Sequence, residues 1–570
     1  MVLRSLQENN MGKKGKALVI FDGGSEAINT KEYDVVLHAK DFVLPGSIYE
    51  ATELVESLPK VVLPDGLRLS KSYVYKGFEL WWIHYNDLFY YFGLPLSQYK
   101  NLLNTLTQYS SVDLYKPSFK PLFIHYLSAH GISVKIIKDF KPEKLLPFGI
   151  LIQICITLIS LPILIITRPA ILVFAGDKFE PGKDFDFRMR FVYAELRKRN
   201  LYFAEFIRSL SSWKTVVSHA ITRRRPVIYS EAVAFISKGL SFFSRKYDVG
   251  NFDHVADPDY KFKLLIGTSY LRSVYSDIWA IRISTWVIKG IGIKAAYFSA
   301  ALDRNYPAVI GAKLNRVKTV GILHGVASRY YNGYDFLPSF DGDKRLSLDK
   351  YGVWSDWWKE YYLKHGAAYT SDQLVVSGPI RPLEREDGVT TLHEMEKTGP
   401  IKVLFVSEQL AVPEEVIPYL EKLLEQDNVE ILFTFRQFGD GFKNWIEKNR
   451  PEILSNPRVK IATSGLVRAI EESEVAVGSH STAVLEMLLK EKMPLFFNSN
   501  KWGDYYSLRE YDSNRTFFAE NPDELITKIM TVRNVSKEIL LDLQKRYFGN
   551  PYQNGSAWLV DELEKGISTP

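Results

Sequence analysis

The sequence predicts an α/β protein in which two larger domains, built on parallel sheets, face a cleft. A smaller α/β domain and one apolar helix precede them. Apolar runs of four to seven residues alternate with helical segments from about residue 168 to 545, which is typical of parallel sheets covered on both faces. The segment 145–167 contains no charged residue. We therefore predict domains at 1–140, 141–167, 168–340 and 341–550, with a C-terminal tail at 551–570.

Composition restricts the class of protein. With 46% hydrophobic and 14% aromatic residues, the chain has ample core and is not globally disordered. The single cysteine, Cys155, excludes an intrachain disulfide and indicates a reducing compartment. A net charge of +6 on 570 residues does not indicate a nucleic-acid partner. The polar start, Met1–Asn10, has no apolar stretch, so no signal peptide is expected.

The N-terminal domain, 1–140, has predicted strands at 16–21, 33–37 and 61–63. Trp81 and Trp82 begin a densely aromatic stretch. We interpret this stretch as core and interdomain packing, and an aromatic platform for sugar or lipid is the alternative. No chemistry is assigned to this domain.

The apolar segment 145–167 is long enough to cross a bilayer. In-plane or re-entrant, spanning and wholly buried arrangements are all open, and Pro162 would kink the last turns. We favour the in-plane arrangement because no export signal precedes the segment. The three lysines between 138 and 144 would contact anionic lipid headgroups. The expected location is therefore the cytoplasmic side of the membrane, peripheral or monotopic, with membrane lipids as partners.

The domain at 168–340 carries the first candidate site. Strands are predicted at 170–174, 226–229, 263–266, 293–298 and 318–323, and a helix at 306–316. His324 follows the last strand and is itself followed by Gly325, a residue that lets another group approach closely. This position suits a general base or a phosphate donor. The alternative is a histidine without a functional role, whose ring only donates a hydrogen bond to a loop carbonyl.

Two further polar groups lie in the same domain. Asp184, Asp186 and Arg188 follow the strand that ends at Phe174 and are candidates for facing an acceptor. The run Arg223–Arg225 would meet phosphate, lipid headgroups or only water, and a solvated charge run is our default.

The domain at 341–550 has the most regular alternation. Its strands are predicted at 401–407, 429–435, 459–462, 475–477, 493–497 and 515–518, and its helices at 413–426, 441–449, 466–472 and 522–532. Ligands of such sheets bind beyond the carboxyl ends of the strands. The end of the strand at 475–477 is therefore a predicted binding edge.

A serine-rich motif starts the helix after that strand. Ser479, Ser481 and Thr482 collect hydroxyls and backbone N–H groups at a predicted helix N-terminus, which favours a phosphate. Glu486 lies one turn further on the same face, placed to accept hydrogen bonds from ribose hydroxyls. The alternative is a capped helix of any α/β domain.

These motifs, taken in order, resemble a family. The elements are Leu323–Ala327, Tyr351–Asp356, Val375–Arg381 and Gly478–Thr482. They look like those of GT-B glycosyltransferases of surface polysaccharide biosynthesis, which have two Rossmann-like domains. The closer resemblance is to CDP-glycerol glycerophosphotransferases and to transferases that use the CMP-sugars of Kdo and sialic acid. It covers about 290–545.

One element departs from the family. Relatives carry a basic residue followed by His-Pro after the second strand of the nucleotide domain, where this chain has Phe435–Gly439. Arg436 can still bind a phosphate bidentately, and Gln437 offers a neutral donor. The donor is then another nucleotide-sugar, or the chain is a catalytically weakened relative.

The resemblance implies a glycosyltransferase that moves a sugar or polyol phosphate from a nucleotide-activated donor to a cell-surface polysaccharide or lipid-linked acceptor. His324 is the expected base and Asp303 the weaker candidate; no metal and no cofactor are expected. A nucleotide-sugar 2-epimerase and a membrane-bound nucleotide-sugar-binding scaffold are the alternatives. The expected donor contacts are Gly325, Arg381, Arg436, Ser479, Ser481, Thr482 and Glu486.

Overall fold

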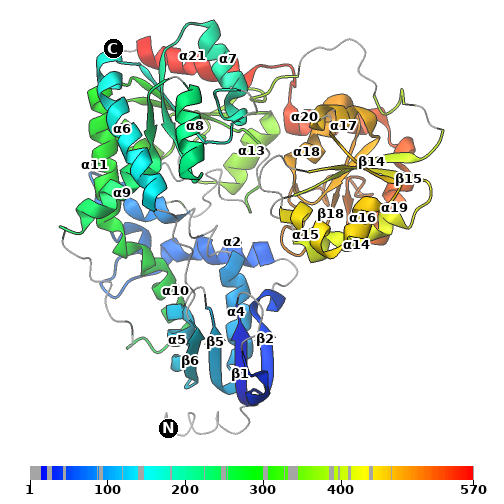
Figure 1. Cartoon of the computed structure of the whole chain (residues 1–570), viewed down its shortest axis with the longest axis horizontal. Coiled ribbons are helices and arrows are strands. Elements are labelled where there is room, and N and C mark those ends of the chain that lie inside the picture. Colours follow the sequence, from blue (N-terminus) through cyan, green and yellow to red (C-terminus); the bar gives the residue numbers. More distant parts are fainter. Residues whose placement is uncertain are drawn as a thin grey trace. The chain divides into compact units, whose positions relative to one another are not determined.

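The structure is a computed structural model of the 570-residue chain (Figure 1). The described residues are 14–21, 28–42, 47–85, 88, 94–117, 120–138, 147–179, 183–223, 225–244, 252, 254–299, 306–325, 328–330, 340, 344–383, 391–395, 398–408, 412–435, 441–463 and 465–568. The chain forms two compact units. The first unit comprises Met1–Leu151 and Ala234–Ile281, and the second Ile152–Val233 and Arg282–Pro570.

The first unit contains a four-stranded parallel sheet in the order β2-β1-β5-β6. Trp81, Trp82 and Tyr85 are each 0% exposed, so this part of the aromatic stretch packs in the core as interpreted. The aromatic residues at 89–92 lie outside the described residues. The strand predicted at 61–63 is reduced to one bridge between Val62 and Arg68. The strands are β1 (Lys14–Ile20), β2 (Val35–His38), β5 (Tyr109–Tyr115) and β6 (Ser133–Lys138), with the hairpin β3 (Val74–Tyr75) and β4 (Phe78–Glu79). The helices are α2 (Ser47–Ser57), α4 (Leu94–Leu106), α5 (Lys120–Ala129) and α10 (Pro258–Thr268).

The prediction of a strand at 263–266 is wrong, because these residues lie inside helix α10. A short apolar run cannot be separated from a buried helical segment by periodicity alone. Three of the run's four residues are apolar and Lys263 is only half-buried.

The second unit contains two parallel sheets, which confirms the predicted α/β class. The first is seven-stranded, in the order β13-β12-β11-β10-β7-β8-β9. Its strands are β7 (Ile171–Ala175), β8 (Phe203–Ile207), β9 (Val227–Tyr229), β10 (Ala295–Tyr297), β11 (Lys318–Ile322), β12 (Lys350–Val353) and β13 (Leu374–Val376). The helices of this part of the chain that lie wholly in the second unit are α7 (Arg190–Lys198), α8 (Trp213–Arg223), α12 (Tyr306–Leu314) and α13 (Asp356–His365). Three further helices have residues in both units: α6 (Pro147–Thr167), α9 (Ser230–Ser241) and α11 (Val274–Ile291).

The domain boundary predicted at 340/341 is wrong. Strand β12 pairs with β11, with Val320 opposite Lys350, and β13 pairs with β12. Residues 350–376 therefore extend the first sheet, because their backbone groups complete its parallel ladder.

The second sheet is six-stranded, in the order β16-β15-β14-β17-β18-β19, and follows the predicted alternation closely. Its strands are β14 (Ile401–Val406), β15 (Val429–Thr434), β16 (Val459–Ile461), β17 (Val475–Gly478), β18 (Met493–Phe497) and β19 (Phe518–Ala519). Its helices are α14 (Pro413–Leu424), α15 (Gly441–Asn449), α16 (Pro451–Ser455), α17 (Leu466–Glu472), α18 (Thr482–Leu485), α19 (Pro522–Met530) and α20 (Lys537–Phe548).

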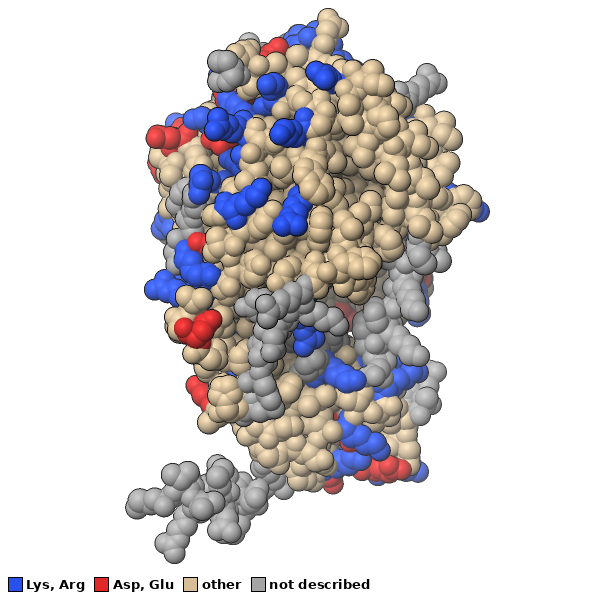
Figure 2. Space-filling view, turned by 90° about the vertical axis from the view of Figure 1, so that its left-hand side faces the viewer, with Lys and Arg blue, Asp and Glu red and all other residues tan. Residues whose placement is uncertain are grey.

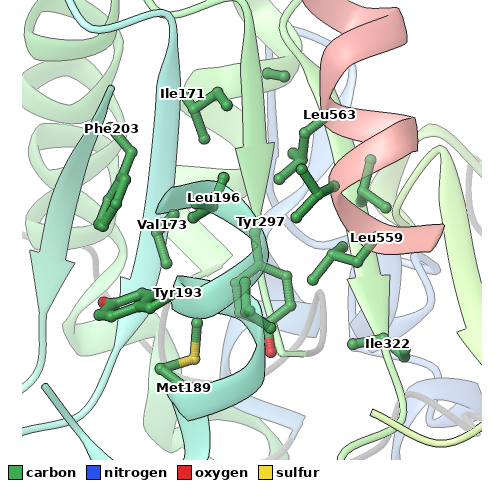
Figure 3. Packing of buried hydrophobic residues seen from close by; sticks show 14 of the residues in the cluster. Ile171, Val173, Met189, Tyr193, Leu196, Phe203, Tyr297, Ile322, Leu559 and Leu563 are labelled. Carbon is green, nitrogen blue, oxygen red and sulfur yellow. The ribbon is translucent and has the colours of Figure 1, made fainter. Parts of the chain in front are cut away.

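The segment predicted as a C-terminal tail is helix α21 (Gly555–Ser568), which packs on the first sheet (Figure 3). Leu559, Val560 and Leu563 are each 0% exposed and share a core with Ile171 and Tyr297. The tail prediction is wrong because an apolar stripe of this helix is buried against strands far earlier in the chain.

Gly378 marks the point where the chain before α21 approaches β13. Its φ of +77° is left-handed, and a Cβ there would lie 2.6 Å from the Gln553 Cβ. We expect Gly378→Ala to lower the free energy of unfolding by about 2–4 kcal/mol through backbone strain and overpacking. Urea denaturation measures this loss of stability. Gly399 has φ +85°, and a Cβ added there would meet nothing within 4 Å, so Gly399→Ala isolates the backbone component. Equal losses in the two variants would contradict crowding at Gly378.

Helix α6 covers the edge strand β9 of the first sheet. Ser160 Oγ accepts from the Val227 N–H at 3.1 Å and Thr157 Oγ1 from the Tyr229 N–H at 3.1 Å. Gln153 Nε2 donates to the Ser209 carbonyl at 3.1 Å. The span Phe148–Thr167 is long and apolar enough to cross a membrane, but only 28% of its most apolar window is buried. A wholly buried helix, one of the three arrangements considered, is therefore not what the structure shows.

Candidate functional site

His324 lies just beyond β11, at the carboxyl edge of the first sheet. The neighbouring strand holds this tip in place, because the Leu323 N–H donates to the Gly352 carbonyl at 2.8 Å. Trp354 Nε1 donates to the Leu323 carbonyl at 2.5 Å. Trp354, which belongs to the motif around β12, thus positions the histidine loop.

The environment of His324 favours the neutral imidazole. Burial, and then the positive charges of Arg188 and Arg381, lower its pKa to about 4, while Asp186 acts in the opposite direction. At neutral pH the ring is therefore uncharged and can accept a proton. This is the state that a general base requires before reaction.

Asp186 and Arg188 form a bidentate ion pair beside His324. Arg188 Nε and Nη2 donate to the two carboxylate oxygens of Asp186, each at 2.9 Å. The Lys178 N–H also donates to Asp186 at 3.0 Å. Gly176 allows this approach, since a Cβ there would lie 2.1 Å from Arg188 Nη2. The Arg188 guanidinium is thus held rigidly near the histidine.

Asp184, grouped with these residues from the sequence, lies in a different network. It accepts from Arg197 Nη2 at 2.9 Å and from Arg225 Nη1 at 2.8 Å. Burial opposes ionisation of Asp184, but the two arginines outweigh it and lower its pKa. Of the three residues, the structure brings only Asp186 and Arg188 to His324.

The charge of Arg381 reaches groups from two motifs. The charge of Arg381 acts on His324 and also on Glu486. Burial raises the pKa of Glu486, and Arg381 partly offsets this rise. Predicted residues from three separate motifs therefore interact electrostatically, and Gly325 is buried directly after His324.

The helix expected after the serine motif is shorter than predicted. Helix α18 has four residues, Thr482–Leu485, and a 3₁₀ segment, Glu486–Lys490, follows it. Ser481 is the N-cap, with its Oγ accepting from the Ala483 N–H at 3.3 Å. One α-helical turn carries a small dipole, so this terminus attracts an anion less strongly than a long helix would.

Glu408 occupies the backbone donors of the serine motif. Its carboxylate accepts from the N–H groups of Ser479, His480 and Ser481 at 2.9, 2.8 and 2.7 Å. Ser479 Oγ also donates to Glu408. Burial alone would raise the pKa of Glu408, but His480 and these hydrogen bonds lower it to about 2. The donors predicted to bind a phosphate are already bonded to a buried carboxylate.

The sequence contained a signal for Glu408 that pattern reading missed. Glu408 lies two residues after β14, which pairs directly with β17. Carboxyl ends of neighbouring parallel strands meet at one edge, so a carboxylate there reaches the loop after β17. Ser479, 1% exposed, consequently faces Glu408, while Ser481 and Thr482 are half-buried.

Arg223 and Arg225 are not solvated, so the default interpretation is wrong for these two residues, while Arg224 lies outside the described residues. Arg223 Nη2 donates to Asp177 at 3.0 Å, and Arg225 Nε donates to Glu205 at 2.6 Å. Glu205 is 1% exposed within β8. A buried carboxylate requires charged partners, which explains why the arginines turn inward. Glu205 also interrupts the apolar run that would have predicted β8.

Two predicted site residues, Asp303 and Arg436, lie outside the described residues, as does Gln437. Among the described residues, no group of three or more His, Cys, Asp or Glu side chains is arranged to hold a metal ion.

Several solved structures align with the chain at low similarity. No family model and no curated protein matches the chain. UDP-GlcNAc 2-epimerase from Neisseria meningitidis bound to UDP-GlcNAc aligns over 69% of this chain and 99% of its own, with 12% identity and a TM-score of 0.40. A glycosyltransferase from Rickettsia africae aligns over 70% and 99%, with 12% identity and a TM-score of 0.40. MurG from Acinetobacter baumannii aligns over 69% and 99%, with 11% identity and a TM-score of 0.40. At these values the likenesses carry no conclusion about activity, and the α/β class rests on the chain's own parallel sheets.

Proposed function

We propose that this protein is a GT-B-type glycosyltransferase that moves a sugar or polyol phosphate from a nucleotide-activated donor to a surface polysaccharide or lipid-linked acceptor. The carrying observation is the position of His324, which follows β11 closely and is acted on by the Asp186–Arg188 pair and by Arg381. Burial and the two arginines lower its pKa to about 4, so the ring is neutral at pH 7. A neutral base beside two cations suits a reaction that removes a proton while negative charge develops nearby.

For sugar transfer, the chemistry assigns each group one task. His324 takes the proton of an acceptor hydroxyl, and the freed oxygen forms a bond to the anomeric carbon of the donor sugar. The bond from that carbon to the nucleotide phosphate breaks, and its electron pair leaves with the phosphate. Arg381 and Arg188 supply positive charge for that leaving group.

The donor side of the proposal rests on Ser481, Thr482 and Glu486. Ser481 and Thr482 are half-buried at the carboxyl edge of the second sheet, where ligands of parallel sheets bind. Glu486 lies on the next turn and interacts with Arg381. We assign the hydroxyls to donor phosphate and Glu486 to ribose. Ser479, being engaged with Glu408, supports the loop instead of contacting the donor.

Replacing both Ser481 and Thr482 by alanine is expected to weaken nucleotide binding by about 10²–10⁴-fold, since each lost hydrogen bond to a charged phosphate is worth about 1.5–3 kcal/mol. Isothermal titration with CMP, CDP and UDP measures the effect. The matched control is Ser455→Ala with Thr527→Ala, because these hydroxyls bond only to carbonyls of their own helices. Unchanged affinity in the Ser481/Thr482 variant would contradict the placement of the donor phosphate.

The activity itself is tested with a panel of nucleotide-sugars, with and without membrane lipid extract. A transferase releases nucleotide in an acceptor-dependent manner. A 2-epimerase changes the sugar without needing an acceptor, and a binding protein does neither. Release of nucleotide only with the lipid extract is the result that we expect.

A nucleotide-sugar-binding scaffold without transfer activity is the second candidate. The observation that favours it is Glu408, whose carboxylate already fills the backbone donors of residues 479–481. Nucleotide binding by calorimetry, combined with no turnover in the panel, would favour this candidate over the transferase.

A further inference from the structure

Helix α6 turns three polar side chains toward the protein, and the large side chains that it exposes are apolar. Gln153, Thr157 and Ser160 are 2%, 4% and 5% exposed. Their spacing of four and three residues places them on one face of a helix. An ordinary surface helix of a soluble protein has the opposite arrangement.

The buried polar stripe explains why the helix stays on the sheet. Strand β9 is the edge of the seven-stranded sheet, and α6 pairs two of its free N–H groups through Ser160 and Thr157. Moving α6 away would leave the Val227 and Tyr229 N–H groups without these partners. The helix is therefore part of the fold, and a spanning arrangement would remove these contacts.

The outward face of α6 is strongly apolar. Among its exposed side chains, Leu158 is 56%, Ile159 67% and Ile166 80% exposed. Leu210, 57% exposed, is a further exposed apolar residue, next in sequence to Ser209, whose carbonyl Gln153 contacts. Figure 2 shows the side of the molecule on which α6 lies in Figure 1, with a broad area free of charged residues. A contiguous apolar surface of this kind marks an interaction site.

The exposed charges of the chain segment that contains most of α6 are of one sign. In the segment 152–233 every described charged side chain that is exposed is basic, and the described Asp and Glu side chains are buried or half-buried. Figure 2 shows Lys and Arg side chains gathered beside the uncharged area. The exposed basic residues of the segment include Arg168, Lys178, Lys183, Arg190, Lys198 and Lys214.

We propose that the outer face of α6 binds the surface of an anionic phospholipid bilayer, with the helix lying in the plane of the interface. Leu158, Ile159 and Ile166 enter the boundary between headgroups and acyl chains. The basic residues contact the anionic headgroups. Charge complementarity favours lipid over a second copy of the chain, whose matching surface would carry the same basic residues.

The test is flotation of the full-length chain with phosphatidylcholine vesicles that contain about 30% phosphatidylglycerol, which supplies the anionic surface. We expect the wild-type chain to float with these vesicles and the variant I159E/I166E to bind at least about 10-fold less. The control is Val467→Glu, a 60% exposed position on α17, which should float like the wild type. Pure phosphatidylcholine vesicles should capture less of the wild-type chain.

Circular dichroism checks that each variant is folded. If I159E/I166E does not fold, the single variant I166E is used in its place. Flotation of the wild type and the folded variant to the same extent would overturn the proposal. A second outcome would also overturn it: the wild-type chain does not float, and light scattering shows that it is a dimer and the variant a monomer. The outer face of α6 would then bind a second copy of the chain. Flotation needs no nucleotide, so it can succeed or fail independently of the proposed transferase.

Discussion

Replacing His324 by alanine is expected to lower turnover by about 10²–10⁴-fold while leaving donor affinity nearly unchanged. The reason is that His324 is neutral at pH 7 and has Arg188 and Arg381 as its cationic neighbours, while the donor phosphate is assigned to the serine loop. Steady-state kinetics with the active nucleotide-sugar, together with calorimetric donor binding, separates the two quantities. An equal loss of donor affinity would place His324 in the phosphate site instead.

The pH profile provides a second measurement on the same residue. Because burial and the two arginines lower the pKa of His324 to about 4, the base form is nearly complete above about pH 5 and is lost as the pH falls through about 4. Activity should therefore show an acidic limb near pH 4, below the ordinary histidine value of 6.5. Far-UV circular dichroism at each pH excludes unfolding as the cause.

The matched control is His393→Ala. His393 is half-buried in the second unit and contacts the Val535 carbonyl at 3.0 Å, remote in sequence from both candidate motifs. Its replacement should leave turnover within about twofold, since changes away from a site have small effects. A wild-type rate in His324→Ala would remove His324 as the base and leave Asp303 as the remaining candidate.

Replacing Glu408 by alanine is expected to lower the free energy of unfolding by about 3–5 kcal/mol, because the buried N–H groups of residues 479–481 lose their acceptor. Urea denaturation measures the loss. Hydrogen exchange with mass spectrometry should show faster exchange at these amides. Glu472→Ala, which removes an exposed carboxylate paired with Arg468, should change stability by less than about 0.5 kcal/mol. Unchanged exchange in Glu408→Ala would contradict the observed hydrogen bonds.

Glu408 also makes stability depend on pH. Its pKa is about 2 in the folded chain against an ordinary 4.5, because His480 and the hydrogen bonds outweigh the effect of burial. A depressed pKa contributes stability that is complete above about pH 4.5 and lost as the pH falls toward 2. The difference between the folded and the ordinary pKa corresponds to roughly 3 kcal/mol. The variant Glu408→Ala should lose this part of the acid dependence.

Local sequence pattern was sufficient to predict the parallel α/β class and most elements of the second sheet. Strands at 475–478 and 493–497 are continuous apolar runs, and helices at 441–449 and 466–472 lie between turn-forming residues. Pattern is sufficient here because a short apolar run bounded by turn-forming residues marks a buried strand whichever strands it pairs with. His324 was identified for the same reason, since it stands directly after an apolar run.

The sheet that a strand joins, in contrast, depends on long-range pairing. Strands β12 and β13 follow the expected domain boundary in sequence, yet their ladders complete the first sheet. Helix α21 returns to that sheet from the far end of the chain, which no local pattern encodes.

Burial of charge was likewise decided in three dimensions. Glu205, Arg223 and Glu408 read as surface residues in sequence because charged side chains are seldom buried alone. In the structure each is paired within the fold, with Glu408 filling the serine loop and Arg223 held between Asp177 and Glu205. Helix α6 shows the opposite situation, in which apolar side chains are exposed. Its composition identified an apolar segment, but only the contacts of Thr157 and Ser160 with β9 determined which side of the helix faces outward.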